Sequence, residues 1–491
     1  MSERTDSAGR DSSRLQTGLD GLDEIIHGGL LPGRSYMIRG PPGAGKTLVG
    51  LHFLTTGACA GEQSLFINMG EAERDVYADA ESFGFDLDDV TLLDLSPSSD
   101  FFAEDQSYDV FPSAEVEPQS MTDTITDRVV DLDPDRVFVD PLTQFRYLST
   151  DEYQFRKRVL SFLRFLKEQE CTVLFTSQDT PTTPDDDLQF MSDGIITLDA
   201  DGPRRTIEVS KFRGSNFDGG RHGVRITDDG MHVFPKLSPG TTVSAEISDP
   251  ISAGVPELDD LLKGGLDPGT VTILSGPSGV GKTTIGTQFA TEFASNGMSS
   301  AIYLFEESER TFRHRSRSIG IPVEKCLDEG SIRLHETHPG QMSTEEFAGH
   351  VRQQVEDRDV EYVMIDGIDG YRHTLLGDDD HVPQLHQLGS YLRNEAVTTL
   401  LTAEVSRITG EFEATDQDVS YLADNLLFLR YLEYRGEMRK AIGVLKKRAS
   451  DFERTLREFE ITDDGVTVGE PLTDLRGILE GTPDWSDEAD S

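Results

Sequence analysis

Lysine, cysteine and tryptophan are scarce in this chain, and acidic residues outnumber basic residues. Its 491 residues include three Cys and one Trp, and 45 Lys plus Arg stand against 90 Asp plus Glu, a formal net charge of −45 at pH 7. Of the basic residues, 11 are Lys and 34 are Arg. Because a carboxylate-rich surface repels itself unless salt screens it, this composition predicts a halophilic protein, with an ordinary acidic mesophilic protein as the alternative. In either case the bulk charge disfavours non-specific binding to nucleic acid.

The cysteines and the apolar segments exclude several classes of protein. Cys59, Cys171 and Cys326 are scattered and form no CxxC pair, so neither a disulfide framework nor a zinc site is indicated. No apolar run approaches the roughly 18 residues that cross a bilayer. Residues 1–14 are rich in Ser, Asp and Arg without an apolar core, so they predict a disordered tail and not a signal peptide. We expect a soluble cytoplasmic protein that does not contact a membrane.

One stretch occurs twice and organises the rest of the chain. Residues 40–47 and 276–283 both read G-x-x-x-x-G-K-T, 236 positions apart. Each follows a short apolar run and precedes a helical segment, which is the context that a phosphate-binding loop requires. The glycines let consecutive backbone N–H groups face one phosphate cluster, and the helix N-terminus adds positive potential. The residues expected to bind ATP in the loops are Gly40, Gly43, Ala44, Gly45, Lys46 and Thr47, and Gly276, Gly279, Val280, Gly281, Lys282 and Thr283.

The duplication extends from the loops to whole domains. Turn glycines recur at the same offset, as Gly18 and Gly254 do, and this regularity indicates a duplicated domain. Buried-type apolar strands alternate with helices in each half, which predicts an α/β doubly wound fold: two tandem P-loop NTPase domains, each a mainly parallel sheet with helices on both faces and closing β-strands. The expected segments are a tail at 1–14, a first domain at 15–236, a linker at 237–250, a second domain at 251–477 and an acidic tail at 478–491.

Two aspartates extend the expected nucleotide sites. Asp140 and Asp366 each end the third apolar run of their half, where the carboxyl ends of parallel strands meet the loop. The loop lysines are expected to reach the β- and γ-phosphates, while the loop threonines and these aspartates hold Mg²⁺. The predicted metal ligands are Thr47, Asp140, Thr283 and Asp366.

A carboxylate that orients or deprotonates the attacking water is also needed for hydrolysis. Glu306 and Glu307 follow the second apolar run of the second half, whereas the first half has Gly70 and Glu71 at the same offset. A glycine cannot act as a base, so the sequence favours the second half as the catalyst. A surface carboxylate pair at a strand end is the alternative interpretation.

A Lys-x-Arg pair recurs in the closing strands of both halves. Lys211 and Arg213 occupy the first, and Lys446 and Arg448 occupy the matching place in the second. Cations so far from the loop in sequence are candidates to complete a site across a subunit boundary, as arginine fingers do. Taken singly, such a pair is often a solvated strand edge.

These residues together resemble the KaiC family, double-domain ATPases of the RecA superfamily that form hexameric rings with nucleotide between subunits. The resemblance runs from about Gly18 to Gly481, and its most specific stretches are residues 434–442 and 212–215. It implies RecA-like domains, a homo-hexamer, a regulatory protein partner, and paired glutamates as catalytic bases. It also implies nucleotide contacts, reaching the neighbouring subunit's nucleotide, by Lys211, Arg213, Thr227 and Asp228, and by Lys446, Arg448, Thr462 and Asp463.

The resemblance further implies autophosphorylation of the second domain on an adjacent Ser-Thr pair. Ser420 is present here, but Tyr421 replaces the threonine. Because a tyrosine hydroxyl lies several ångströms further from the backbone, Ser420 is the one candidate phosphosite at this pair, and a solvated acidic loop is the alternative.

Two other functions are open at the level of the sequence. One is a recombinase-like DNA-dependent ATPase, although no helical DNA-binding domain precedes the first loop and no basic stretch stands out. The other is a scaffold that holds nucleotide only to assemble. An autokinase or ATPase acting as a signalling switch is the interpretation that the resemblance favours.

Overall fold

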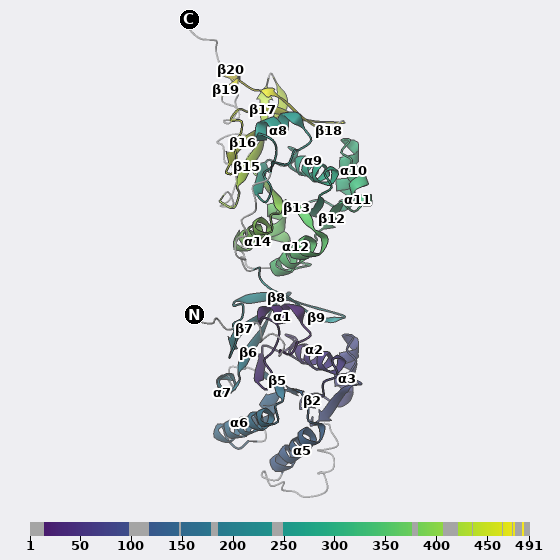
Figure 1. The fold of residues 1–491 in the computed structure, drawn as a ribbon, viewed down its shortest axis with the longest axis vertical. Helices are drawn as coiled ribbons and strands as arrows, with labels where there is room; N and C mark the ends of the chain where they lie inside the picture. The colour runs from purple at the N-terminus through teal and green to yellow at the C-terminus, as the bar shows by residue number, and fades with distance from the viewer. Residues whose placement is uncertain are drawn as a thin grey trace, which may run out of the picture. The chain divides into compact units, whose positions relative to one another are not determined.

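The chain divides into two compact units, Met1–Lys236 and Leu237–Ser491, each with its own nine-stranded sheet (Figure 1). The computed structural model describes residues 14–97, 117–146, 149–177, 185–237, 249–375, 382–405, 421–434, 436–463, 465–473, 475–476 and 484–485. Within these ranges, no helix is long and apolar enough to cross a membrane.

The first sheet has the order β3-β2-β4-β5-β1-β6-β7-β8-β9. Its strands are parallel from β3 to β6 and antiparallel from β6 to β9, so a parallel sheet is closed by a meander. The strands are β1 (Ser35–Arg39), β2 (Ser64–Asn68), β3 (Val90–Asp94), β4 (Arg136–Asp140), β5 (Thr172–Ser177), β6 (Gly194–Asp201), β7 (Arg204–Phe212), β8 (Arg221–Thr227) and β9 (Gly230–Phe234).

Helices cover both faces of this sheet because alternate strand residues point to opposite sides. In β2, for example, Phe66 belongs to one apolar cluster, whereas Leu65 and Ile67 belong to the other. The first cluster includes side chains of α1 (Asp20–Ile25), α2 (Lys46–Cys59) and α3 (Glu73–Ser82). The second includes side chains of α5 (Glu117–Leu132), the 3-10 helix η3 (Leu142–Arg146), α6 (Glu152–Glu168) and α7 (Asp186–Met191).

The second unit repeats this architecture, with the strand order β12-β11-β13-β14-β10-β15-β16-β17-β18. Its strands are β10 (Val271–Gly276), β11 (Ser299–Leu304), β12 (Ile332–Glu336), β13 (Val360–Asp366), β14 (Thr398–Glu404), β15 (Asn425–Tyr434), β16 (Glu437–Lys447), β17 (Arg457–Thr462) and β18 (Gly465–Pro471). One face carries α8 (Pro256–Leu262), α9 (Lys282–Ser295), α10 (Glu309–Ser318) and α11 (Val323–Asp328). The other carries α12 (Thr344–Arg358), α13 (Ile368–Thr374) and α14 (Val382–Asn394).

The predicted fold class is confirmed, since both units are mainly parallel α/β sheets with helices on both faces and closing antiparallel strands. Two details were not predicted. The outer strands β3 and β12 are half-buried, so they lack the continuous apolar run that identifies the inner strands. In addition, β19 (Leu475–Arg476) pairs with β20 (Asp484–Trp485), which lies in the predicted acidic tail.

Candidate nucleotide-binding sites

Both phosphate-binding loops join the central strand of their sheet to a helix. The first runs from the end of β1 to the start of α2, and the second from the end of β10 to the start of α9. Their last glycines, Gly45 and Gly281, have φ angles of 98° and 120°, which L side chains rarely adopt. A Cβ at Gly45 would lie 2.6 Å from Met231 Cε, and one at Gly281 would lie 2.7 Å from Ile461 Cδ1. Backbone conformation and packing therefore both require glycine here.

The loop lysines point back over their own loops. Lys46 Nζ donates hydrogen bonds to the carbonyl oxygens of Gly40 and Pro41, at 2.8 and 2.9 Å. Lys282 Nζ makes the same two bonds in the second loop, at 2.8 and 3.1 Å. Burial lowers the pKa of both lysines, and neighbouring carboxylates oppose this effect. Each ammonium thus lies at the mouth of a cradle of the kind that binds phosphate oxygens.

The predicted metal ligands lie in contact with one another in both units. Thr47 Oγ1 donates to Asp140 Oδ2 at 2.7 Å, and Thr283 Oγ1 donates to Asp366 Oδ1 at 3.1 Å. A second threonine on β5 or β14 also donates to each carboxylate. Burial raises the pKa of both aspartates, and these hydrogen bonds oppose the increase. A hydroxyl and a carboxylate beside a phosphate cradle are the hard oxygen donors that suit Mg²⁺.

The two predicted catalytic glutamates of the second unit differ in their surroundings. Glu307 Oε1 accepts a hydrogen bond from Arg315 Nη2 at 2.5 Å, and Arg315 Nη1 donates to Thr284 Oγ1 at 3.3 Å. Burial raises the pKa of Glu307 to about 7, although Arg315 opposes the shift. Burial and the charge of Asp366 also raise the pKa of Glu306. With a pKa of about 7, Glu307 can therefore exchange a proton near neutral pH, and the same physical causes act on Glu306 beside it.

Glu306 occupies a position that is more tightly enclosed in the first unit. It packs against Gly367, where an added Cβ would lie 2.6 Å from Glu306 Oε1. In the first unit Pro141 follows Asp140 as Gly367 follows Asp366, and a Cβ at Gly70 would lie 3.3 Å from Pro141 Cδ. In the first unit the glycine, Gly70, follows β2 and the larger residue, Pro141, follows β4. In the second unit the larger residue, Glu306, follows β11 and the glycine, Gly367, follows β13.

Glu71 is the one carboxylate at the corresponding strand end in the first unit, and it is exposed. Asp79 of α3 lies at the position that matches Arg315. Burial first, and then the charge of Asp79, raise the pKa of Glu71. The first unit therefore has a pair of like charges where the second has an ion pair.

The Lys-x-Arg pair of the first unit lies at the far end of its sheet from the loop. Lys211 faces Ile195 across the β6–β7 ladder, and its Nζ donates to the carbonyl of Gln189 at 2.7 Å. The backbone N–H of Arg213 donates to Asp193, whose own N–H donates to the carbonyl of Ser35, the first residue of β1. The phosphate loop instead follows the last residue of β1.

The second unit repeats that arrangement. Lys446 Nζ donates to the carbonyl of Ala423 at 2.6 Å, and Arg448 pairs with Asp424 at 3.5 Å. The N–H of Asp424 donates to the carbonyl of Val271, the first residue of β10. Neither Lys-x-Arg pair is thus brought to the loop of its own domain.

The remaining predicted contacts, Thr227 and Asp228, and Thr462 and Asp463, lie in the hairpin turns β8–β9 and β17–β18. Side chains next to these turns lie closest to the last glycine of each loop: Met231 and Ile226 beside Gly45, and Ile461 and Phe459 beside Gly281. Thr462 Oγ1 also donates to the carbonyl of Gly465 at 3.2 Å, closing its turn. These four residues therefore lie near the loop of their own domain, unlike the Lys-x-Arg pairs. Ser420, the candidate phosphosite, lies outside the described residues.

The sequence is similar to known proteins along nearly its whole length. The family model "ATPase: KaiC" matches residues 15–238 and 251–473. The chain belongs to the KaiC ATPase family. Similar proteins include "Circadian clock oscillator protein KaiC" from Acaryochloris marina, 26% identical over 486 residues, covering 96% of this chain and 91% of that protein. The proteins of the same name from Nostoc sp. and Synechococcus elongatus are each 25% identical, covering 98% and 96% of this chain and 94% and 92% of their own lengths.

Within this KaiC-family chain, Arg315 is the functional candidate that sequence reasoning missed. It belongs to α10, whose Arg310, Arg313, Arg315 and Arg317 make it basic, so the expectation that no basic stretch stands out is wrong here. Three of these arginines pair with glutamates of the same unit. The signal was available, because the matching helix α3 carries Asp79 in place of Arg315.

Proposed function

We propose that this KaiC-family ATPase binds Mg²⁺-ATP in both loops and assembles into a ring, expected to be a hexamer, with each nucleotide between two subunits. The observation that carries this proposal is the position of the Lys-x-Arg pairs, which lie beside the amino ends of β1 and β10, whereas the loops follow the carboxyl ends of these strands. A strand rises about 3.3 Å per residue, so the five residues of β1 separate Lys211 and Arg213 from their own loop by roughly 15 Å. These cations can therefore contact a phosphate only when the nucleotide is bound in the loop of a neighbouring subunit.

The chemistry is assigned chiefly to the second unit. There Lys282 would bind the terminal phosphates, and Thr283 and Asp366 would hold Mg²⁺, which neutralises phosphate charge when bound. The Glu306–Glu307 pair would accept the proton of the attacking water. The first unit, with Gly70 in place of one glutamate, would serve mainly in binding and assembly.

Mixed assemblies test whether the sites are shared. One variant is Lys282→Ala, which loses the loop lysine, and the other is Arg448→Ala, which loses the trans-acting cation. Each alone should hydrolyse ATP slowly, whereas co-assembly places some intact loops beside intact arginines and should restore part of the rate. Mixtures that are no more active than the sum of the two variants would contradict a shared site. Light scattering with Mg²⁺-ATP tests the ring, and monomers alone would refute it.

We further propose that the second unit phosphorylates itself on Ser420, and that this modification and a regulatory protein partner make the chain a switch. The support is the family membership together with the serine at this position. Intact-mass measurement after incubation with Mg²⁺-ATP in molar salt should show one added phosphate that is absent from Ser420→Ala. An unchanged mass would refute the kinase and leave the ATPase.

A further inference from the structure

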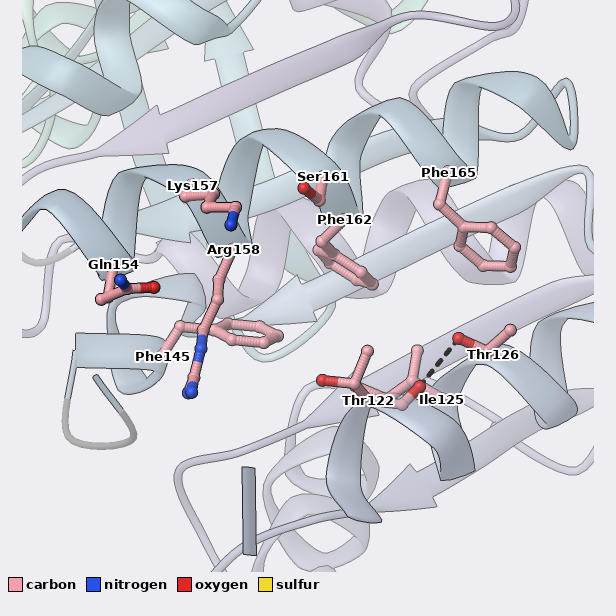
Figure 2. Close-up of a pocket in the computed structure, with 10 residues that line it drawn as sticks. All are labelled: Thr122, Ile125, Thr126, Phe145, Gln154, Lys157, Arg158, Ser161, Phe162 and Phe165. Atoms are coloured by element: carbon pink, nitrogen blue, oxygen red, sulfur yellow. Dashed lines mark hydrogen bonds between the residues drawn. The ribbon is translucent and has the colours of Figure 1, made fainter. Parts of the chain in front are cut away.

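A pocket of about 300 Å³ lies in the first unit between α5, η3 and α6 (Figure 2). Its apolar lining comes from Ile125, Phe145, Phe162 and Phe165, and Figure 2 shows the rings of Phe162 and Phe165 directed from α6 toward α5. The rings of Phe145 and Phe162 are 5.4 Å apart and tilted. This volume is at the lower end of the range for sites that bind small molecules.

The second unit has a hydrogen bond across the corresponding seam. The two units match here at an offset of 226, since Asp133 and Asp359, which follow α5 and α12, both have left-handed φ angles near 50°. Phe165 then corresponds to Tyr391, and Val130 corresponds to Glu356. Tyr391 Oη donates to Glu356 Oε1 at 3.2 Å and so ties α14 to α12.

No such bond is available in the first unit, because Phe165 and Val130 lack the polar atoms. Val130 is instead 56% exposed, and Leu160 of α6 is exposed to the same degree. These exposed apolar side chains on α5 and α6 are a departure from an otherwise heavily charged surface. The first unit therefore lacks the hydrogen bond that joins the two helices at this seam in the second unit.

Positive charge gathers at the same pocket. Lys157 and Arg158 belong to its lining, and the second unit has Pro383 and Gln384 at the matching positions. Lys157 has no ion-pair or hydrogen-bond partner among the residues that the structure describes. Lys157 and Arg158 belong to a run of three basic residues that begins at Arg156, in a chain with a net charge of −45. Positive charge at the rim of an apolar pocket favours anionic ligands over neutral ligands of the same shape.

We propose that this pocket binds a small amphipathic anion, an aromatic carboxylate whose ring enters between Phe145, Phe162 and Phe165 and whose carboxylate meets Lys157 and Arg158. Aromatic rings favour aromatic partners, which pack edge-to-face or offset against them. The carboxylate gains charge-assisted hydrogen bonds from the two cations. This site lies on the helical layer of the first unit and is independent of the nucleotide assignment.

The test uses naphthalene-2-carboxylate as the probe, with saturation-transfer NMR and calorimetric titration on the full chain. Naphthalene-2-carboxamide, which has the same shape without the charge, is the matched control ligand. The carboxylate should bind about threefold or more tightly than the amide at moderate salt. Lys157→Gln plus Arg158→Gln should remove that preference, whereas Arg164→Gln, an exposed cation of α6 that pairs with Glu168, should keep it.

A second pair of substitutions closes the pocket without removing a cation. Val130→Glu plus Phe165→Tyr copies the Glu356–Tyr391 bond of the second unit and should abolish binding of both ligands while thermal unfolding stays cooperative. Equal binding of carboxylate and amide would overturn the assignment to an anion. Undiminished binding in this closed variant, or no binding by the original chain at millimolar probe, would overturn the site itself.

Discussion

Replacing Arg315 by Gln should move the pH dependence of ATP hydrolysis. The arginine favours the charged form of Glu307, whose pKa is about 7, so its removal raises that pKa further. A base must be deprotonated to act, and the acidic limb of the pH–rate profile should therefore move to higher pH. Because Glu306 is coupled to Glu307, the limb reports the pair and not one residue.

The magnitude follows from the exposure of the ion pair. The side chains of Arg315 and Glu307 are 29% and 20% exposed, so solvent screens part of the interaction. About 1 kcal/mol is a reasonable value for such a pair, and it corresponds to a limb displaced by about 0.7 pH unit. At pH 7 the deprotonated fraction would then fall from about a half to about a sixth, and the rate would fall about threefold.

Steady-state ATPase rates between pH 6 and pH 9.5 test this, with Arg317→Gln as the control. Arg317 lies on the same helix but pairs with Glu324, so its profile should match that of the original chain. The Arg315→Gln rate should recover at high pH. A loss that is uniform across pH, or an unmoved limb, would refute the idea that Arg315 sets the charge of the glutamate pair.

Three further predictions concern the first unit, salt and the metal ligands. In a Glu306→Gln plus Glu307→Gln background, Gly70→Glu should not restore hydrolysis, because the new Cβ approaches Pro141. Gly70→Glu plus Pro141→Gly should raise the ATPase rate. Equal rates for these two variants would contradict the idea that Pro141 restricts the space at position 70. Raising KCl from low to molar concentration should increase the unfolding temperature by several degrees, since salt screens a net charge of −45; a flat or falling trend by calorimetry would exclude the halophilic interpretation. Asp366→Asn should weaken Mg²⁺-dependent hydrolysis by about a hundredfold or more, while Asp140→Asn should affect it much less; the reverse order would assign the chemistry to the first unit.

Much of the fold could be predicted because its signals are local. The inner strands are continuous apolar runs, and the loop glycines mark strand–loop–helix units in both halves. The outer strands β3 and β12 carry no such run, since one side of each is only partly covered. Topology alone puts them at the edge of the sheet.

The features that were missed depend on contacts between distant or non-periodic positions. Arg315 of α10 contacts Glu307, eight positions earlier and before the helix begins. This separation does not match the i, i+3 or i, i+4 spacing by which ion pairs within a helix are recognised in a sequence. The exchange between Gly70–Pro141 and Glu306–Gly367 joins strand ends some 60 to 70 residues apart, so only the folded sheet reveals it. The predicted Lys-x-Arg pairs were visible as a repeat, but their position at the far end of the sheet needed the strand register.

The most direct measurement is the ATPase rate of three proteins under identical conditions: the original chain, Glu306→Gln plus Glu307→Gln, and Glu71→Gln. The structure predicts that the double variant loses nearly all turnover, because both carboxylates beside the second loop are neutral. It predicts that Glu71→Gln keeps most of the rate, since the first unit has Gly70 where the second has Glu306. A double variant as active as the original chain would contradict the assignment of hydrolysis to the second unit.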